Sequence, residues 1–237
     1  MPPVFMHKKQ SADHWISLSD IMTALMMIFL LISIVYMIRV QESVDIPRIF
    51  KAHEQQLYSQ LQQNLEKKLG KWGATLSPDL TVRFNDEDIL FKVGSAELQP
   101  QFKQALDEIF PTYLREMMDK RHIENMREIR IEGHTSSFWA HGVDAETAYI
   151  NNMHLSQQRA QNTLIYLLKS PHLTAQEKAW LKKKFRAIGY SSALTLDAHG
   201  QPTKNAKDED MNNSQRVEFR VVTNAEERIR AVAYGEL

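Results

Sequence analysis

The chain has 237 residues, with 29 Lys and Arg, 29 Asp and Glu, and a formal net charge of zero. This balance argues against a nucleic-acid-binding protein, because such proteins concentrate basic residues on one face. The absence of cysteine excludes disulfides, thiolate metal sites and cysteine catalysis. A mean hydropathy of −0.41 is typical of a soluble protein, but the apolar residues are distributed unevenly along the chain.

Near the N-terminus, residues 21–38 read IMTALMMIFLLISIVYMI and contain no charged side chain. At about 1.5 Å per residue, this run is slightly shorter than a hydrocarbon core of roughly 30 Å, so we expect a transmembrane helix over residues 15–39. The run is too long for a cleavable signal peptide. A Lys8-Lys9 pair precedes it and only Arg39 follows immediately, which favours a cytoplasmic tail over residues 1–14 and an extracytoplasmic remainder.

Asp20 lies inside this expected span. An ionised Asp near the centre of a membrane helix costs about 2.5–3.5 kcal/mol on insertion scales, so its presence indicates a functional role. The alternative places Asp20 at the cytoplasmic rim, where it would be solvated and would cap the helix together with Ser19. Trp15 and Ile16 extend the apolar segment upstream of Asp20 and favour the first interpretation.

A Trp followed by Asp-x-x-Thr and a Leu/Met/Phe run resembles the transmembrane signature of MotB-type stator subunits. The resemblance implies that Asp20, with Thr23 beside it, carries a translocated proton or sodium ion, and that no other cofactor is needed. It also implies a homodimer of this chain inside a ring, expected to be a pentamer, of a multi-helix MotA- or ZorA-like membrane subunit. The residues that carry the signature are Trp15, Asp20, Thr23, Leu25, Met26 and Phe29 to Leu31.

The segment after the span, residues 40–75, is predicted to be a linker helix with a narrow apolar stripe. The stripe could pair with a second copy of the chain, which would make this a dimerisation helix, or it could pack on the distal domain. The stator resemblance adds a third option, a plug for the ion path. Glycines at positions 70 and 73 and Ser77-Pro78 mark the boundary with a domain over residues 76–237. The stripe consists of Ile46, Phe50, Leu57, Leu61, Leu65 and Leu69.

In the distal domain, three segments alternate apolar and polar residues and are expected to be half-buried strands. Between them we expect one helix opened by Pro100, a second from about Leu155 to Lys169, and a third introduced by a capping box at Thr174–Glu177. The order predicts an α/β sandwich with helices on one sheet face. The chain as a whole is therefore expected to be α+β. The expected strands are residues 80–84, 129–132 and 217–221.

Five ordered blocks over about residues 76–224 resemble the OmpA-like peptidoglycan-binding domain. The resemblance implies a periplasmic domain that binds the peptide stem of peptidoglycan, whose diaminopimelate carries a carboxylate and an ammonium group. The blocks are Ile89-Leu-Phe91 with Gly94 to Leu98, Ile131 to Thr135, Asn152 with Leu155-Ser156 and Arg159-Ala160, Gly189-Tyr190, and Asn213 with Arg216 to Glu218.

The resemblance implies that Arg159 binds the stem, and a guanidinium does form planar bidentate pairs with a carboxylate. Asn152 and Leu155 occupy positions that border this site in the family. The family usually reads Gly-His-Thr-Asp, whereas this chain has Ser136 at the acid position. A longer loop, expected over residues 137–150, follows it. We expect Asp144 in this loop to replace the missing charge; otherwise binding is weaker or altered.

The nine histidines form no metal-binding motif such as His-Glu-x-x-His, and His134 is explained by its strand-end motif, so no metal site is expected. The sequence also contains no phosphate loop, no nucleophile elbow and no carboxylate pair for sugar cleavage. These absences predict a protein that binds the wall without cutting it, and therefore not an enzyme.

Together these features predict a single-pass bacterial inner-membrane protein that carries an ion and is anchored to peptidoglycan. The short N-terminal tail, Ser136 and the enlarged loop look more like ZorB, the MotB-like subunit of the Zorya antiphage defence motor, than like a flagellar stator subunit. A passive tether between membrane and cell wall, with Asp20 in a structural role, is the alternative of a different class.

Overall fold

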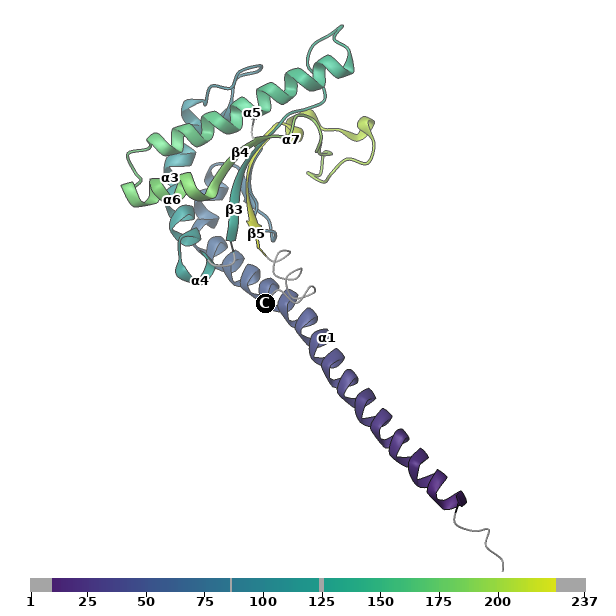
Figure 1. Cartoon of the computed structure of the whole chain (residues 1–237). Coiled ribbons are helices and arrows are strands. Elements are labelled where there is room, and N and C mark those ends of the chain that lie inside the picture. Colours follow the sequence, from purple (N-terminus) through teal and green to yellow (C-terminus); the bar gives the residue numbers. More distant parts are fainter. Residues whose placement is uncertain (1–9, 86, 124–125, 225–237) are drawn as a thin grey trace, which may run out of the picture. The chain divides into compact units, whose positions relative to one another are not determined.

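The computed structural model describes residues 10–85, 87–123 and 126–224 (Figure 1). Residues 1–9 of the expected tail and residues 225–237 of the expected distal domain lie outside the described residues, as does the side chain of Trp15. The chain divides into two compact units, the first ending at Arg48 and the second spanning Ile49–Glu226.

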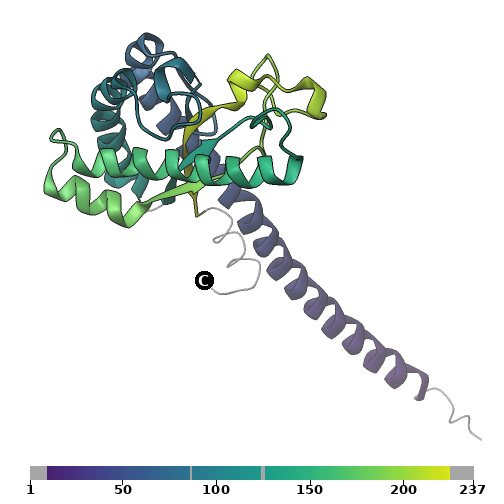
Figure 2. The same cartoon turned by 90° about the horizontal axis from the view of Figure 1, so that it is seen from above.

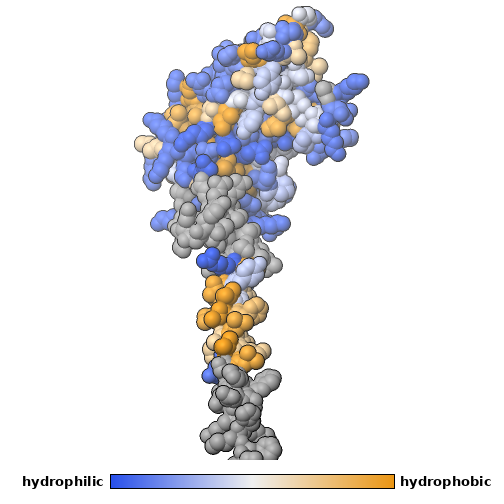
Figure 3. Space-filling view, turned by 45° about the vertical axis from the view of Figure 1, so that its right-hand side comes forward, coloured by the Kyte–Doolittle hydropathy of each residue, from blue (hydrophilic) through white to orange (hydrophobic). Residues whose placement is uncertain are grey.

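Helix α1 covers Gln10–Lys71 and therefore includes both the expected transmembrane span and the expected linker helix. Its sequence contains one proline, Pro47, next to the boundary between the two units, and no glycine before Gly70, one residue before the end. Residues Leu18–Gln41 form a 24-residue stretch, with a mean hydropathy of 2.6 over an 18-residue window, that is long and apolar enough to cross a membrane. Its hydrophobic side chains are exposed around the helix (Figure 3).

The last turns of α1 belong to the second unit, because Leu61 and Leu65 are completely buried in its core. Polar contacts reinforce this packing: Lys71 Nζ forms an ion pair with Glu108 at 2.7 Å, and Trp72 donates to the same carboxylate. Of the alternatives for the leucine stripe, packing on the distal domain is the one observed. The part of the stripe from Leu57 to Leu69 is therefore not available for pairing with a second copy.

The sheet has five strands in the order β1-β2-β5-β3-β4. The pairs are antiparallel except β3 with β4, which are parallel and are joined by the long crossover connection that a parallel pair requires. The strand bounds are β1 Ala74–Leu76, β2 Val82–Phe84, β3 Met126–His134, β4 Phe185–Gly189 and β5 Arg216–Thr223.

Helices cover one face of this sheet, and α5 crosses it in both views (Figures 1 and 2). Alternation along the strands points apolar side chains toward the helices, where Phe219 of β5 contacts Phe110 and Tyr113 of α3 with ring centroids 5.8 and 6.1 Å apart. The helix bounds are α2 Glu87–Leu90, α3 Pro100–Met117, α4 Lys120–Ile123, α5 Ala145–Lys169, α6 Ala175–Lys184, the 3-10 turn η1 Ala206–Asp208, and α7 Met211–Ser214.

The α+β class and the helix-covered sheet are as predicted, and the capping box of Thr174 and Glu177 is formed. The start of α5 differs from the prediction. We expected this helix from about Leu155, but it begins at Ala145 because the Asp144 side chain caps it by accepting from the backbone N–H of Thr147. Much of the expected loop over residues 137–150 is therefore helix, and the connection between β3 and α5 covers only residues 135–144.

Candidate functional site

Two glycines hold α5 against the sheet close to the expected binding residues. A Cβ on Gly133 of β3 would lie 2.2 Å from the carbonyl oxygen of Ser156, and one on Gly189 of β4 would lie 2.4 Å from the backbone nitrogen of Gln157. Gln157 completes the junction by accepting from the Gly189 N–H at 2.8 Å. Because only glycine permits this approach, these positions fix how far α5 stands from the sheet.

Arg159 lies on α5 one turn after this junction and is only 2 % exposed. Its Nε donates to the carbonyl oxygen of Ser95 at 3.0 Å and its Nη1 to Oε1 of Gln215 at 3.4 Å. The guanidinium also lies over the Phe91 ring, 4.9 Å from its centroid. These three contacts, two from the connection between α2 and α3 and one from the residue before β5, hold the guanidinium plane in one orientation, as recognition of a planar anion requires.

Asn152 and Leu155 lie on the same face of α5 as Arg159, because their spacing of three and four residues repeats once per turn. Both side chains are buried. Asn152 donates from Nδ2 to the carbonyl oxygen of Phe138 at 3.3 Å, which joins α5 to the preceding loop. The structure thus brings three of the five expected binding residues together on one helix face.

Ser136, at the position of the family acid, is buried where β3 ends. Asp144 is exposed, and its two carboxylate oxygens accept from the Thr147 N–H at 2.9 Å and the Thr147 hydroxyl at 2.7 Å. These hydrogen bonds, the backbone one first, hold the pKa of Asp144 below its usual range. The structure gives Asp144 a capping function; its role toward a ligand stays a prediction.

An acidic residue that the sequence pattern does not predict, Glu209, contacts the residue next to Ser136. Glu209, between η1 and α7, accepts from the backbone N–H of Ser137 at 2.9 Å and, through its other oxygen, from the Ser137 hydroxyl. The Glu209 side chain is partly buried. Because 72 positions separate the two residues, no local pattern could have predicted this contact.

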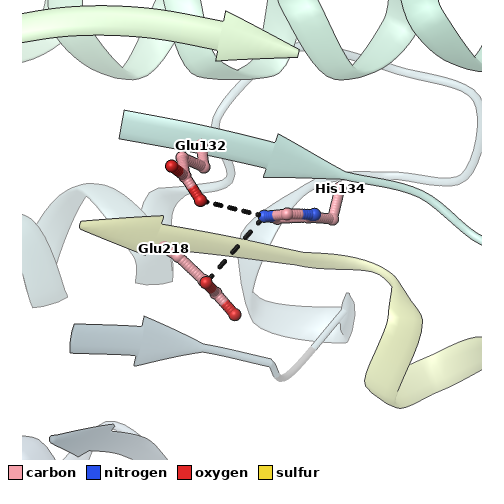
Figure 4. A group of neighbouring side chains, drawn as sticks. All are labelled: Glu132, His134 and Glu218. Carbon is pink, nitrogen blue, oxygen red and sulfur yellow. Dashed lines mark ion pairs between the residues drawn. The ribbon is translucent and has the colours of Figure 1, made fainter. Parts of the chain in front are cut away.

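On the sheet face opposite the helices, Glu132, His134 and Glu218 form a buried cluster (Figure 4). The Nε2 atom of His134 lies 3.6 Å from a Glu132 carboxylate oxygen and 3.9 Å from one of Glu218. The register that pairs Glu132 with Glu218 brings the two acids together. The ring of Tyr190 stacks on His134 at 5.1 Å and covers the cluster. Burial lowers the pKa of His134, which favours the neutral imidazole.

These three residues are of types that bind metals, but three arginines already neutralise the acids. Glu218 accepts from Arg83 at 2.8 Å, from Arg216 at 2.7 Å and from Arg220 at 2.9 Å. Burial, the largest single influence, would raise the pKa of Glu218, but the surrounding positive groups, Arg216 foremost, together outweigh it and lower that pKa to about 2. Three positive charges against two carboxylates oppose a bound cation, so the arrangement is that of a buried ion-pair network.

Comparison with known proteins relates the chain to two families. The model of the OmpA family matches residues 90–209. Zorya protein ZorB of Escherichia coli strain Crooks is 43% identical over 231 residues, which cover 95% of this chain and 94% of that protein. The chain belongs to the ZorB family. The resemblance to ZorB expected from the sequence is thereby confirmed.

A second ZorB, from Escherichia coli O139:H28, is 27% identical over 200 residues, covering 78% of this chain and 76% of that relative. Among solved structures, a putative MotB-like protein from Desulfovibrio vulgaris matches with a TM-score of 0.47 and 22% identity, covering 73% of this chain and 93% of that one. The cell wall anchor of the T6SS from Pseudomonas aeruginosa matches with a TM-score of 0.44 and 19% identity, covering 69% and 96%.

Proposed function

We propose that this chain is the ion-carrying, peptidoglycan-anchored subunit of a membrane rotary motor, the Zorya antiphage defence motor. The observation that carries the proposal is the 43% identity to a Zorya protein over nearly the whole chain, including the apolar helix that contains Asp20. The chain would lie in the bacterial inner membrane, with residues 1–14 cytoplasmic, a span over residues 15–39 and a periplasmic distal domain.

In the membrane, Asp20 would alternate between an ion-bound neutral form and a free charged form. Thr23 lies one turn further along α1 and donates from its hydroxyl to the Ser19 carbonyl oxygen at 2.8 Å, so its oxygen stays next to Asp20 on the helix surface. A unit charge that crosses a potential of 100 mV releases about 2.3 kcal/mol. This energy is enough to favour a different packing of the membrane subunits each time Asp20 binds and releases an ion.

A single helix cannot line an ion path, so the mechanism needs a partner. The proposed partner is a multi-helix ZorA-like membrane subunit, a pentamer around a homodimer of this chain. In such an assembly the Asp20 carboxylate would face the partner helices, because a charged side chain facing lipid is costly. Each change in its ionisation would then alter the contact between the two subunits.

In the distal domain, Arg159 would bind the carboxylate of the peptide stem, with Asn152 and Leu155 bordering the pocket. The ammonium group of the stem needs an acid in place of Ser136. The sequence favours Asp144; Glu209, hydrogen-bonded to Ser137, is a second candidate. Gripping the wall would hold this chain still while ion flow drives rotation of the partner.

Two other functions remain as alternatives, a flagellar stator subunit and a passive tether. Cells that express the chain with its membrane partner should resist phage in a plaque assay, and the pair should not restore swarming to a strain without flagellar stators. Restored swarming without phage resistance would support the flagellar function. Ion flux through the pair separates a motor from a tether, because a tether conducts nothing.

A further inference from the structure

The connection between β3 and α5 presents aromatic side chains to solvent. Phe138 is 44% exposed and Trp139 is 37% exposed, and both follow directly after the strand-end motif. In Figure 1 this connection lies at the N-terminal end of α5, the opposite end from α6. Exposed aromatic residues of this size are costly in water, and where they adjoin a binding site they commonly extend it.

Contacts at both ends and in the middle hold the backbone of this loop and the Phe138 ring in place. At one end the Ser137 backbone N–H and hydroxyl donate to Glu209, and at the other end Asp144 caps α5. In between, the Phe138 carbonyl oxygen accepts from Asn152, and the Phe138 ring meets His141 edge-on with centroids 5.4 Å apart. Because the loop backbone is already fixed, a ligand that binds there does not have to order it, and part of the entropy cost of binding is avoided.

The chemistry of the loop favours a neutral carbohydrate. Residues 137–143 read SFWAHGV and contain no Asp, Glu, Lys or Arg, so they offer nothing to pair with an anionic lipid surface or a charged peptide. Aromatic faces carry partial negative charge and attract the C–H groups on the face of a pyranose ring. A glycan strand of neutral N-acetylated sugars matches this surface.

Geometry links the loop to the pocket on α5. The same Asn152 that is proposed to border the stem donates from its side chain to the Phe138 carbonyl oxygen, so the loop is joined directly to the face of α5 that carries Arg159. In peptidoglycan the stem is covalently joined to a sugar of the glycan strand. A stem held at Arg159 therefore brings the sugar that carries it to the rim of the pocket, where the loop lies.

We propose that Phe138 and Trp139 form a sugar-stacking subsite that binds the glycan strand beside the stem pocket. This inference rests on the proposed peptidoglycan binding. The subsite would let the domain distinguish a stem that is still attached to the wall from a free peptide. It also assigns a binding role to the loop over residues 137–143, which the family motif does not cover.

The test compares two ligands on the full chain in detergent: a free stem peptide containing diaminopimelate, and the same peptide attached to its disaccharide. The native chain should bind the attached stem about tenfold more tightly, since stacking of two rings contributes on the order of 1–2 kcal/mol. The double variant Phe138→Ala with Trp139→Ala should lose this gain and bind the free peptide as before. An unchanged thermal unfolding midpoint would show that the variant is folded.

The matched control is Ile165→Ala, which removes another exposed apolar side chain from the later part of α5 and should leave both affinities unchanged. If the double variant keeps the tenfold gain, or loses affinity for both ligands equally, Phe138 and Trp139 do not form a sugar-binding subsite. The proposed binding of the stem by Arg159 is not affected by that result. If the native chain binds neither ligand, both the proposed function and this inference are overturned.

Discussion

Gly133 of β3 lies against the backbone of Ser156 so closely that a Cβ at this glycine would be 2.2 Å from the Ser156 carbonyl oxygen. No side-chain adjustment can relieve that contact, because the obstructing atom is backbone. Arg159 lies on α5 three residues after Ser156, so this approach also sets the position of Arg159 relative to the sheet. The position of the candidate site therefore depends on a residue that is not itself proposed to bind the ligand.

Replacing Gly133 with Ala should force α5 away from the sheet and destabilise the distal unit by roughly 3 kcal/mol, the upper range for overpacking. Chemical denaturation followed by circular dichroism measures this change. The control is Gly70→Ala: a Cβ at Gly70 meets nothing within 4 Å and lies in a helix, so this variant should be stabilised by about 0.5–1 kcal/mol. Equal stability of the Gly133→Ala variant and the native chain would contradict the packing described here.

Replacing Arg159 with Lys keeps the charge but removes the planar pair of donors. We expect at least tenfold weaker binding to isolated sacculi in a sedimentation assay, because a charge-assisted bidentate contact contributes about 1.5–3 kcal/mol. The matched variant Arg130→Lys changes an arginine that pairs with Glu128, and should bind as the native chain does. Native-like binding by a folded Arg159→Lys chain would remove Arg159 from the site.

The acidic residue that pairs with the ammonium group of the peptide stem can be identified by comparing Asp144→Asn with Glu209→Gln. If Asp144 replaces the family acid, Asp144→Asn should weaken binding to the stem peptide several-fold, and adding salt should weaken the native chain more than the variant. If Glu209 supplies the charge, the effect should follow Glu209→Gln instead. Asn caps a helix about as well as Asp, so Asp144→Asn should keep nearly native stability, and a change in affinity then reports on the charge. Unchanged affinity in both variants would exclude a carboxylate contact from either residue.

The buried ion-pair network predicts sensitivity to acid. The pKa of Glu218 is lowered to about 2 in the folded chain from an ordinary value of 4.5, so its contribution to stability is present above pH 4.5 and is lost as the pH falls toward 2. The free energy of unfolding should fall by on the order of 3 kcal/mol over that range. Glu218→Gln should be less stable at pH 7, because Arg216 loses its buried partner, and should show a smaller pH dependence. If the free energy of unfolding depends on pH equally steeply in Glu218→Gln and in the native chain, other groups are responsible for the acid sensitivity.

Much of the fold could be predicted from local pattern. Helix α3 has an apolar residue on almost every turn after Pro100, and the Thr174 capping box marks the start of α6, so both were located. The start of α5 was misplaced because residues 145–154, AETAYINNMH, show no clear apolar stripe. That stretch is helical because Asp144 caps it and because Ser191 donates to the carbonyl oxygen of Tyr149.

The candidate site residues Asn152, Leu155 and Arg159 come from the resemblance to the OmpA-like domain, and their role stays a prediction. Helical spacing places Leu155 and Arg159 on one face, but Asn152 joins that face only because α5 begins at Ala145, ten residues before the predicted start. The contact of Glu209 with Ser137 and the pairing of Glu132 with Glu218 depend on chain segments that meet only in the folded domain. The leucine stripe of α1 was recognised from its spacing, but spacing cannot tell which surface covers it.

In the proposed motor, the Asp20 carboxyl carries the ion that drives rotation. The most direct measurement is ion uptake into vesicles that contain the chain together with its multi-helix partner, comparing the native chain with Asp20→Asn. This role of Asp20 requires that Asp20→Asn abolishes uptake, while membrane insertion and co-purification with the partner stay native. Uptake at the native rate through the Asp20→Asn assembly would contradict it.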